Sequence, residues 1–277
     1  MNLKFTVVTV VFNGEAVIRK TIESVLNQEY APYEYLIFDG QSKDNTLKII
    51  DSYKEQFEKR GISFVVTSGK DTGIYNAMNK GVKAAKGDFI SFLNAGDWYE
   101  LDALKNINAF YQEEPFELTY GGLHYINPNG TVTNKMSKND EHGIVTSRHW
   151  NHPSMFLTAE LYKQNGFEET FPAYADFNLY LKMRKQGVKI RVINKVITNF
   201  VADGVSTNTN MKKVLGRAKE KYKAYRGNGY SALYWFESYG WEVFKAIYFS
   251  IRSCQERYYE QQLVQGADED DKSAVWG

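Results

Sequence analysis

The sequence predicts an α/β protein whose mostly parallel sheet is covered by helices on both faces. Short apolar, β-branched runs alternate with amphipathic stretches between residues 5 and 93, an alternation typical of parallel sheets. The first run, Phe5–Phe12, is almost wholly apolar, as expected of a central strand buried on both faces. A chain of 277 residues, 43% of them hydrophobic, is long enough for one large domain and an appendage.

The next elements follow from the spacing of apolar residues and from the turn residues between them. A helix is expected over 17–30, because Ile18, Ile22 and Val25 fall on one of its faces. Asp44 is expected to cap a second helix that ends before Gly61. The remaining elements of this region are strands at 35–38, 62–67 and 89–93 and a helix at 74–86.

The regular alternation of predicted strands and helices ends after Tyr111. The turn sequence Asn127–Gly130 separates two strand-like runs, so we expect a hairpin with strands at 118–126 and 131–136. The elements expected after it are a short helix at 157–166, a helix at 175–186, a strand at 188–193 and a loop at 198–210.

The last part of the chain is basic and aromatic. Residues 211–260 contain ten Lys or Arg against five Asp or Glu, and thirteen aromatic residues lie between Tyr222 and Tyr259. We therefore predict a domain at 1–210 and a helical appendage at 211–277 that ends in an acidic tail. The appendage suits contact with an anionic membrane surface. It suits somewhat better a helical pair packed on the first domain or in a homodimer.

The composition excludes several classes of protein. A net charge of +1 provides no global field for binding nucleic acid. Cys254 is the only cysteine, so no intrachain disulfide can form and a reducing compartment is expected. No run approaches the roughly eighteen uncharged apolar residues of a transmembrane helix, and the first residues lack the features of a signal peptide.

Polar residues follow four of the predicted strands. They are Asn13, Asp39, Asp71 and the stretch Asn94–Asp97. Ligands of open α/β sheets bind beyond the carboxyl ends of the strands, so these side chains predict a ligand crevice. Each of them alone is equally expected as a turn or helix-capping residue. A nicotinamide-dinucleotide site needs three glycines after the first strand, whereas only Gly14 is present, so the phosphates of a bound nucleotide would need a metal or side chains.

Seven stretches, taken in order, resemble glycosyltransferase family 2, the inverting nucleotide-sugar transferases with a GT-A fold. They are residues 6–13, 21–28, 39–46, 71–81, 87–97, 152–154 and 175–179. Any one of these stretches is a weak signal, but the ordered combination is specific and spans roughly the first two-thirds of the chain. No motif of the C-terminal segment matches the family.

The resemblance implies a role for each matching residue. Asp176 would be the general base that takes the proton of an acceptor hydroxyl, as the hydroxyl attacks the anomeric carbon in a single displacement with inversion. Asp97 and His152 would bind Mn²⁺ or Mg²⁺. The nucleotide-sugar would be bound by Val11, Asn13, Asp39, Asp71, Asn94 and Ala95. Without the resemblance, Asp176 is better explained as a helix cap, and His152 is as often structural as functional.

The chain departs from the family pattern at the metal motif. The family often has two aspartates flanking one residue, whereas this chain has Asn94-Ala95-Gly96 and retains only the charge of Asp97. One carboxylate can still hold a cation when substrate phosphates complete its shell. Because the metal motif keeps only one carboxylate, a second interpretation stays open, in which the protein is a non-catalytic subunit that binds sugar nucleotides or glycans. Nucleotidyl transfer would need a basic, glycine-rich loop near the first strand, and the sequence has none.

The resemblance also implies a substrate class and a setting. We expect a hexosyl- or N-acetylhexosaminyltransferase that uses a UDP-sugar and acts on a glycan or lipid-linked acceptor. Such proteins usually serve surface-polysaccharide or glycoconjugate assembly, in the cytoplasm or peripherally at the inner face of the membrane. The sugar, the acceptor and the linkage do not follow from the sequence.

Overall fold

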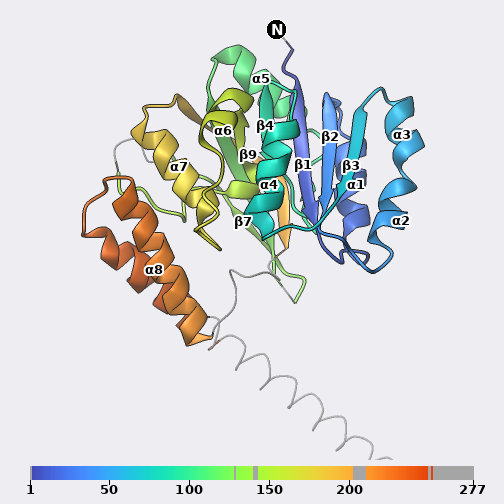
Figure 1. Ribbon diagram of the computed structural model, residues 1–277. Helices are drawn as coiled ribbons and strands as arrows, with labels where there is room; N and C mark the ends of the chain where they lie inside the picture. Colours follow the sequence, from blue (N-terminus) through green and yellow to red (C-terminus); the bar gives the residue numbers. More distant parts are fainter. Residues whose placement is uncertain (1, 128, 140–142, 202–209, 249–250, 252–277) are drawn as a thin grey trace, which may run out of the picture. The chain divides into compact units, whose positions relative to one another are not determined.

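The computed structural model describes residues 2–127, 129–139, 143–201, 210–248 and 251 (Figure 1). The chain divides into two compact units, Met1–Asp203 and Gly204–Gly277. The predicted division after residue 210 stays a prediction. Cys254 and the acidic tail lie outside the described residues.

A nine-stranded sheet forms the centre of the first unit, within its described residues. Its strands are β1 (Phe5–Val11), β2 (Glu34–Asp39), β3 (Ser63–Ser68), β4 (Phe89–Phe92), β5 (Trp98–Tyr99), β6 (Leu118–Ile126), β7 (Val132–Lys135), β8 (Phe156–Thr158) and β9 (Ile190–Val201). The order is β3-β2-β1-β4-β8-β6-β9-β5, and β7 pairs with β6. Strands β1 to β4 pair in parallel, as predicted. The other half is mixed, because β8 runs antiparallel to both β4 and β6.

Helices cover both faces of this sheet, which confirms the predicted α/β class (Figure 1). They are α1 (Ile18–Leu26), α2 (Thr46–Asp51), α3 (Lys54–Lys59), α4 (Ile74–Ala84), α5 (Ala103–Glu113), α6 (Ala159–Asn165) and α7 (Ala175–Lys185). Helices α1, α2, α3 and α5 share one core with Phe5 and Val7 of β1. Helix α4 packs on the opposite face, where a Cβ at Gly81 would come within 2.6 Å of Val8 Cγ1. Glycine at position 81 therefore lets α4 approach the centre of the sheet.

Three local predictions have the right type of element but the wrong extent. The single helix predicted after Asp44 is two short helices, α2 and α3, and the N-cap of α2 is Asn45. The Asp44 carboxylate nevertheless accepts from the N–H of Thr46, the first residue of α2, and it also accepts from Glu15 N, so it ties the start of this short helix to the loop after β1. The helix predicted at 157–166 is confirmed as α6 at Ala159–Asn165, and residues 157 and 158 belong to strand β8 instead. The strand predicted at 188–193 continues to Val201, because β6 and β5 pair with its second half.

The predicted hairpin is confirmed, since β6 and β7 pair antiparallel around the turn. In the second unit, α8 (Met211–Gly227) starts at Asn210, whose side chain accepts from Lys212 N. A π-helical turn, η3 (Phe236–Gly240), leads into a helical segment at 241–248. The described residues of this unit are thus mainly helical, as expected of the appendage. Within the described part of the chain, no helix combines the length and the apolar content that a bilayer crossing needs.

Candidate active site

The ends of three parallel strands meet at one edge of the sheet. Val11 at the end of β1 is in register with Asp39 of β2, and Gly40 N donates to Val11 O at 2.8 Å. Asp39 is in turn in register with Ser68, the last residue of β3. A Cβ at Gly40 would lie 3.7 Å from Asp71 Oδ2, so the loop after β3 lies against the end of β2. The polar residues predicted to follow these strands are therefore neighbours.

The loops after β1 and β2 are joined by hydrogen bonds through Asn13. Its backbone N–H donates to Ser42 Oγ at 2.7 Å, and its carboxamide oxygen accepts from Lys43 N at 2.9 Å. Asn13 has a φ of +49° and Gln41 a φ of +63°. Non-glycine residues in this region cost on the order of 1–3 kcal/mol each and persist where the surroundings hold them. The Asn13 side chain thus fixes the shape of the rim.

Asp39 is 1% exposed, and the protein uses only part of the hydrogen-bonding capacity of its carboxylate. Ser42 N donates to its two carboxylate oxygens at 3.3 and 3.1 Å, and Ser68 Oγ donates at 2.6 Å. An ionised carboxylate offers about four lone-pair sites, so Asp39 retains capacity to accept one further hydrogen bond from a ligand.

Asp71 forms an ion pair with Lys80 of α4. Lys80 Nζ also donates to Lys70 O at 3.0 Å, which ties the loop after β3 to the helix that follows it. No local pattern in the sequence indicates a role for Lys80, although the residue lies within the matching stretch 71–81. Its ammonium group brings a positive charge to the rim, beside the acidic residue that was predicted to contact the nucleoside.

The stretch after β4 forms a tight turn that fixes Asn94, Ala95 and Asp97. The backbone φ of Gly96 in this turn is +101°, a conformation that residues other than glycine rarely adopt. Asp97 is 5% exposed, and its Oδ1 accepts from Val201 N at 3.0 Å. Asn94 Oδ1 is buried and has no hydrogen-bond partner among the described residues. A buried acceptor without a partner is costly, so this oxygen is available to a ligand.

The turn also adjoins the loop after β1. A Cβ at Gly14 would lie 3.8 Å from Ala95 Cβ and 2.5 Å from Val11 Cγ2. Glycine at this position lets the two loops approach each other, so Val11 and Ala95 line the same part of the rim.

Asp176 lies in the first turn of α7, where Tyr174 is the N-cap. Its Oδ1 accepts from Tyr75 Oη at 3.1 Å and from Phe177 N at 2.7 Å. Its Oδ2 is 3.3 Å from His152 Nδ1. Because Tyr75 belongs to the first turn of α4, which follows β3, this contact brings Asp176 to the carboxyl-end rim of the sheet. No local pattern in the sequence indicates the contacts of Asp176 with Tyr75 and His152.

His152 is 9% exposed and sits on a 3₁₀ turn, η1 (His152–Ser154). Burial lowers the pKa of its imidazole, and the nearby Asp176 charge only partly offsets this effect. The ring is therefore neutral near pH 7. Since the Asp176 carboxylate can only accept, Nδ1 is assigned as the donor and Nε2 keeps a lone pair. Nε2 is buried without a hydrogen-bond partner among the described residues.

Trp150 does not form an open stacking surface. It is 5% exposed, its Nε1 donates to Met155 Sδ at 3.4 Å, and its ring stacks on Tyr180 with centroids 5.1 Å apart. The Trp150 ring also packs against the His152 ring, and the two ring centroids are 5.7 Å apart.

No group of three or more His, Cys, Asp or Glu side chains suited to a metal ion occurs among the described residues. The donors near the turn after β4 are oxygen atoms of one carboxylate and one carboxamide. Oxygen donors fit Mg²⁺ or Mn²⁺, but the protein groups alone form an incomplete shell. A cation here would need ligands from a substrate.

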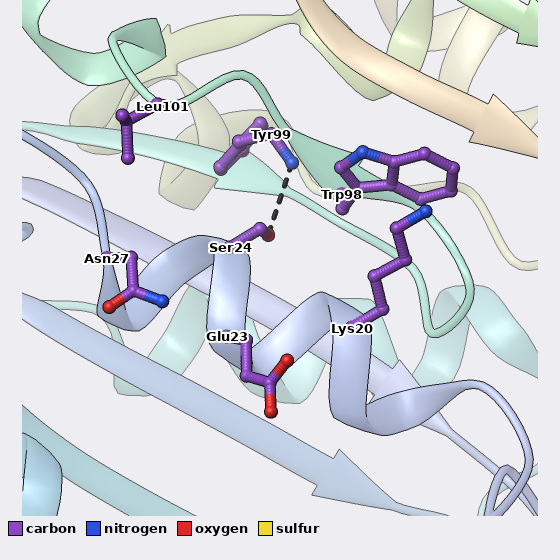
Figure 2. A pocket seen from close by; sticks show the side chains of 7 residues that line it. All are labelled: Lys20, Glu23, Ser24, Asn27, Trp98, Tyr99 and Leu101. Atoms are coloured by element: carbon purple, nitrogen blue, oxygen red, sulfur yellow. Dashed lines mark hydrogen bonds between the residues drawn. The ribbon is translucent and has the colours of Figure 1, made fainter.

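A hollow of about 260 Å³ lies between α1 and β5, and it contains none of the predicted site residues (Figure 2). It is lined by Lys20, Glu23, Ser24, Asn27, Trp98, Tyr99 and Leu101. Lys20 Nζ lies 3.1 Å from the centroid of the Trp98 ring, so the lysine covers the aromatic face. Ser24 Oγ accepts from Tyr99 N at 3.2 Å, and this bond holds β5 on α1 (Figure 2). The hollow therefore lies where β5 packs on α1.

Several proteins of known name are similar to this chain in sequence. The chain is 28% identical to hyaluronan synthase of Pasteurella multocida over 216 residues, which is 76% of this chain but 21% of that protein. It is 28% identical over 260 residues to a dolichyl N-acetyl-α-D-glucosaminyl phosphate 3-β-D-2,3-diacetamido-2,3-dideoxy-β-D-glucuronosyltransferase of Methanococcus voltae, covering 83% of this chain and 76% of the relative. A PGL/p-HBAD biosynthesis glycosyltransferase of Mycobacterium tuberculosis is 34% identical over 121 residues, which is 43% of this chain and 46% of that protein. This chain thus spans well under two-thirds of two of these three relatives.

Solved structures share the fold. TarS residues 1–349 of S. aureus, in complex with UDP, has a TM-score of 0.58 at 18% identity, covering 88% of this chain and 81% of that one. The mannosyltransferase PcManGT of Pyrobaculum calidifontis, in complex with GDP-Man and Mn²⁺, has a TM-score of 0.59 at 14% identity, covering 97% and 80%. At these identities the likeness is one of fold, and it confirms the predicted GT-A architecture.

The family itself is shown by sequence. The model of "Glycosyl transferase family 2" matches residues 6–181, more than half of the chain. That range includes β1, the turn after β4 and Asp176. The chain therefore belongs to glycosyl transferase family 2.

Proposed function

We propose that this protein is an inverting glycosyltransferase that moves a sugar from a UDP-linked donor to an acceptor hydroxyl. The observation that supports this most is the fixed carboxylate of Asp176. Tyr75 and Phe177 N hold one of its oxygens and His152 faces the other, at the rim where the parallel strands end. A carboxylate fixed beside a ligand crevice is suited to accept a proton from a bound hydroxyl.

In the proposed reaction, Asp176 takes the proton of the acceptor hydroxyl as its oxygen attacks the anomeric carbon. The bond between that carbon and the diphosphate breaks on the opposite face, so the configuration inverts. Single displacement needs one carboxylate base and no second carboxylate as a nucleophile. Inversion is part of the proposal, because it requires the acceptor to lie between Asp176 and the donor sugar.

We assign the donor to the rim of β1 to β4. Asp39 would accept a hydrogen bond from the imide of uracil, for which its carboxylate has a free lone-pair site. Asp71 and Lys80 would lie against the nucleoside, with the lysine's charge toward the phosphates. Val11, Asn13 and Ala95 would shape the pocket through backbone and apolar contacts rather than through charge.

A divalent cation, Mn²⁺ or Mg²⁺, fits the donors at the turn after β4. Asp97 and the buried oxygen of Asn94 would hold it, together with oxygens of the donor diphosphate. When bound, the cation would neutralise charge on the diphosphate leaving group. His152 was predicted as a further ligand through nitrogen. Its Nε2 lone pair suits that role, and its Nδ1 contact with Asp176 would orient the ring.

The acceptor and the setting are also proposals. Two of the related proteins are named as a polysaccharide synthase and a transferase acting on a dolichyl-linked sugar phosphate. We propose a glycan or lipid-linked acceptor, used in surface-polysaccharide or glycoconjugate assembly in the cytoplasm at the inner face of a membrane. The transferred sugar would be a hexose or an N-acetylhexosamine.

A thermal-shift panel of nucleotides and nucleotide sugars, with and without Mn²⁺, tests the donor. A true donor at a hundredfold excess over Kd should stabilise the protein by about 2.7 kcal/mol. Release of UDP in the presence of acceptors then tests turnover. Stabilisation without any UDP release would support the alternative, a non-catalytic binding subunit. If no nucleotide stabilised the protein, the donor site itself would be wrong.

A further inference from the structure

The carboxamide of Asn79 joins helix α4 to the loop that leads from α6 into α7. Its Oδ1 accepts from Phe167 N at 2.8 Å, and its Nδ2 donates to Phe167 O at 2.9 Å. One side chain therefore holds both backbone groups of one loop residue. Asn79 Nδ2 also donates to Glu169 Oε1 at 3.1 Å. We call these three hydrogen bonds the Asn79 clamp.

The partners of the Asn79 amide fix its orientation. A backbone N–H only donates, so Phe167 N must meet the amide oxygen. The hydrogen bond from Asn79 lowers the pKa of the Glu169 carboxyl, so this group is ionised at neutral pH and only accepts. The backbone φ of Gly166 is +60°, and a Cβ there would lie 3.3 Å from Asn79 Oδ1. Glycine at position 166 therefore leaves room for the carboxamide.

The residue that the clamp holds packs against two side chains that contact Asp176. Phe167 is 4% exposed, and its ring centroid lies 5.5 Å from that of Tyr75 and 6.0 Å from that of His152. Tyr75 Oη donates to Asp176 Oδ1, and His152 Nδ1 lies 3.3 Å from Asp176 Oδ2. The position of the Phe167 ring therefore bears on the contacts of both carboxylate oxygens.

The clamp also restrains the spacing between α4 and α7. Tyr75 and Asn79 are four residues apart in α4, so they lie on the same side of the helix. Tyr75 reaches Asp176 in the first turn of α7, and Asn79 reaches the loop that precedes this turn. The bond from Tyr75 to Asp176 forms only while the two helices keep their distance. Because the clamp holds the loop by its backbone, it helps to maintain that distance.

We propose that Asn79 is a positioning residue for the base of the transfer reaction. By holding Phe167 against α4, it keeps Tyr75 and His152 in contact with Asp176, so the carboxylate keeps one orientation toward the acceptor hydroxyl. Asn79 acts through these side chains and not on the reacting atoms. Its role in transfer rests on the proposed function, whereas its effect on the contacts of Asp176 does not.

Two alanine variants of α4 separate the clamp from its surroundings. Asn79→Ala removes all three bonds. The matched control is Asn76→Ala, because Asn76 lies on the same helix and its Nδ2 donates to Glu169 Oε2 at 3.1 Å. Both variants lose a bond to the same exposed carboxylate, but only Asn79→Ala loses the bonds to the backbone of Phe167. Transfer kinetics give kcat, calorimetry gives the donor Kd, and crystal structures of both variants show the contacts of Asp176.

The expected result is a loss of kcat in Asn79→Ala without a loss of donor affinity. A misplacement of about 1 Å at a reacting group can cost about a hundredfold in rate, so we expect kcat to fall at least about tenfold. The donor Kd should stay unchanged, because the base acts on the acceptor proton in the transition state. The crystal structure of Asn79→Ala should show the bond from Tyr75 to Asp176 lost. Asn76→Ala should keep both this bond and the wild-type kcat.

A second substitution, Asn79→Asp, keeps the size of the side chain and the acceptor for Phe167 N. It turns both donations of Nδ2 into contacts between acceptors, so kcat should fall by about twofold or more, again at unchanged donor Kd. This variant decides the kinetic test if Asn79→Ala does not fold, and a wild-type kcat in it would then overturn the proposal.

Equal losses of kcat in Asn79→Ala and Asn76→Ala would overturn the positioning role, because the bonds to the loop backbone would then have no separate effect. A loss of donor affinity at unchanged kcat would overturn it as well. If the wild type transferred no sugar, the proposed function would fail and the crystal structures would decide about Asn79. An unchanged bond between Tyr75 and Asp176 in the Asn79 variant would overturn the proposal in either case.

Discussion

The hydroxyl of Tyr75 should matter for transfer through its bond to Asp176. The change is Tyr75→Phe, which removes one oxygen atom and keeps the ring. That ring packs 5.5 Å from Phe167, so the aromatic contact survives. The lost bond is the 3.1 Å donation to Asp176 Oδ1. Phe177 N and His152 still contact the carboxylate, so the group loses part of its orientation without becoming isolated.

The expected size of the effect follows from the type of bond. A hydrogen bond to a charged group contributes about 1.5–3 kcal/mol, and the lower end applies because the Asp176 side chain is 18% exposed and keeps two other contacts. About 1.5 kcal/mol corresponds to roughly a tenfold change in rate. We therefore expect kcat to fall about tenfold in Tyr75→Phe. The affinity for the donor should stay unchanged, because the bond acts on the base.

The assay is transfer kinetics together with the donor Kd for each variant. Tyr162→Phe is the matched control, because the Tyr162 hydroxyl is buried with no hydrogen-bond partner among the described residues. Removing it should leave kcat unchanged and should not lower stability. Equal kcat losses in both variants would refute the positioning role of Tyr75. A loss of donor affinity in Tyr75→Phe, with kcat preserved, would refute it as well.

Three further predictions concern the rim and its pH response. Asp39→Ala should weaken UDP binding by ~1–3 kcal/mol, measured by calorimetry. Asp44→Ala should instead lower the melting temperature and leave the affinity for UDP unchanged. The reverse pattern would contradict the assignment of Asp39 to the site. Asp97→Asn, which keeps the acceptor for Val201 N, should weaken UDP binding with Mn²⁺ present and change it little in EDTA. Because burial lowers the pKa of His152 below its ordinary 6.5, the unfolded chain binds a proton that the folded chain does not, and stability should fall as pH drops below about 6.5. Urea unfolding at pH 7 and pH 5 should show a smaller loss in His152→Gln than in the wild type.

The parts of the fold that the sequence predicted are those with strong local patterns. Strand β1 is buried along its whole length, so its residues are apolar without interruption. The hairpin of β6 and β7 is marked by turn residues, and α4 and α7 have clear beginnings and ends. Strand β8 has only three residues, and its pairing with β4 and β6 depends on partners far away in the chain. No periodicity can develop over three residues, so β8 and the antiparallel pairs that it makes with β4 and β6 were not predictable.

In the candidate site, too, local sequence patterns indicate some residues, whereas others are brought together only by the fold. Asp39, Asp71 and Asp97 could be found because each lies at the end of a predicted strand or in the loop that follows it. The contact between Tyr75 and Asp176 joins residues that are 101 positions apart, and it exists only once α4 and α7 are packed. Lys80 could not be recognised either, because a lysine within a helix is ordinarily exposed to solvent and nothing in the local sequence marks this one as different. The resemblance to a family supplied a role for Asp176 that its local pattern, that of a helix cap, did not indicate.

The most direct test of the account is transfer by Asp176→Asn. Asparagine keeps an oxygen that can accept from Tyr75 and Phe177 N, and the neutral His152 ring can change tautomer to face the amide, so the fold and the melting temperature should hold. General-base catalysis is typically worth ~10²–10⁴-fold, so kcat should fall at least about a hundredfold. The Kd for the UDP-sugar should hardly change, because the base acts on the acceptor proton in the transition state. Transfer near the wild-type rate in this variant, with intact donor binding, would contradict the account.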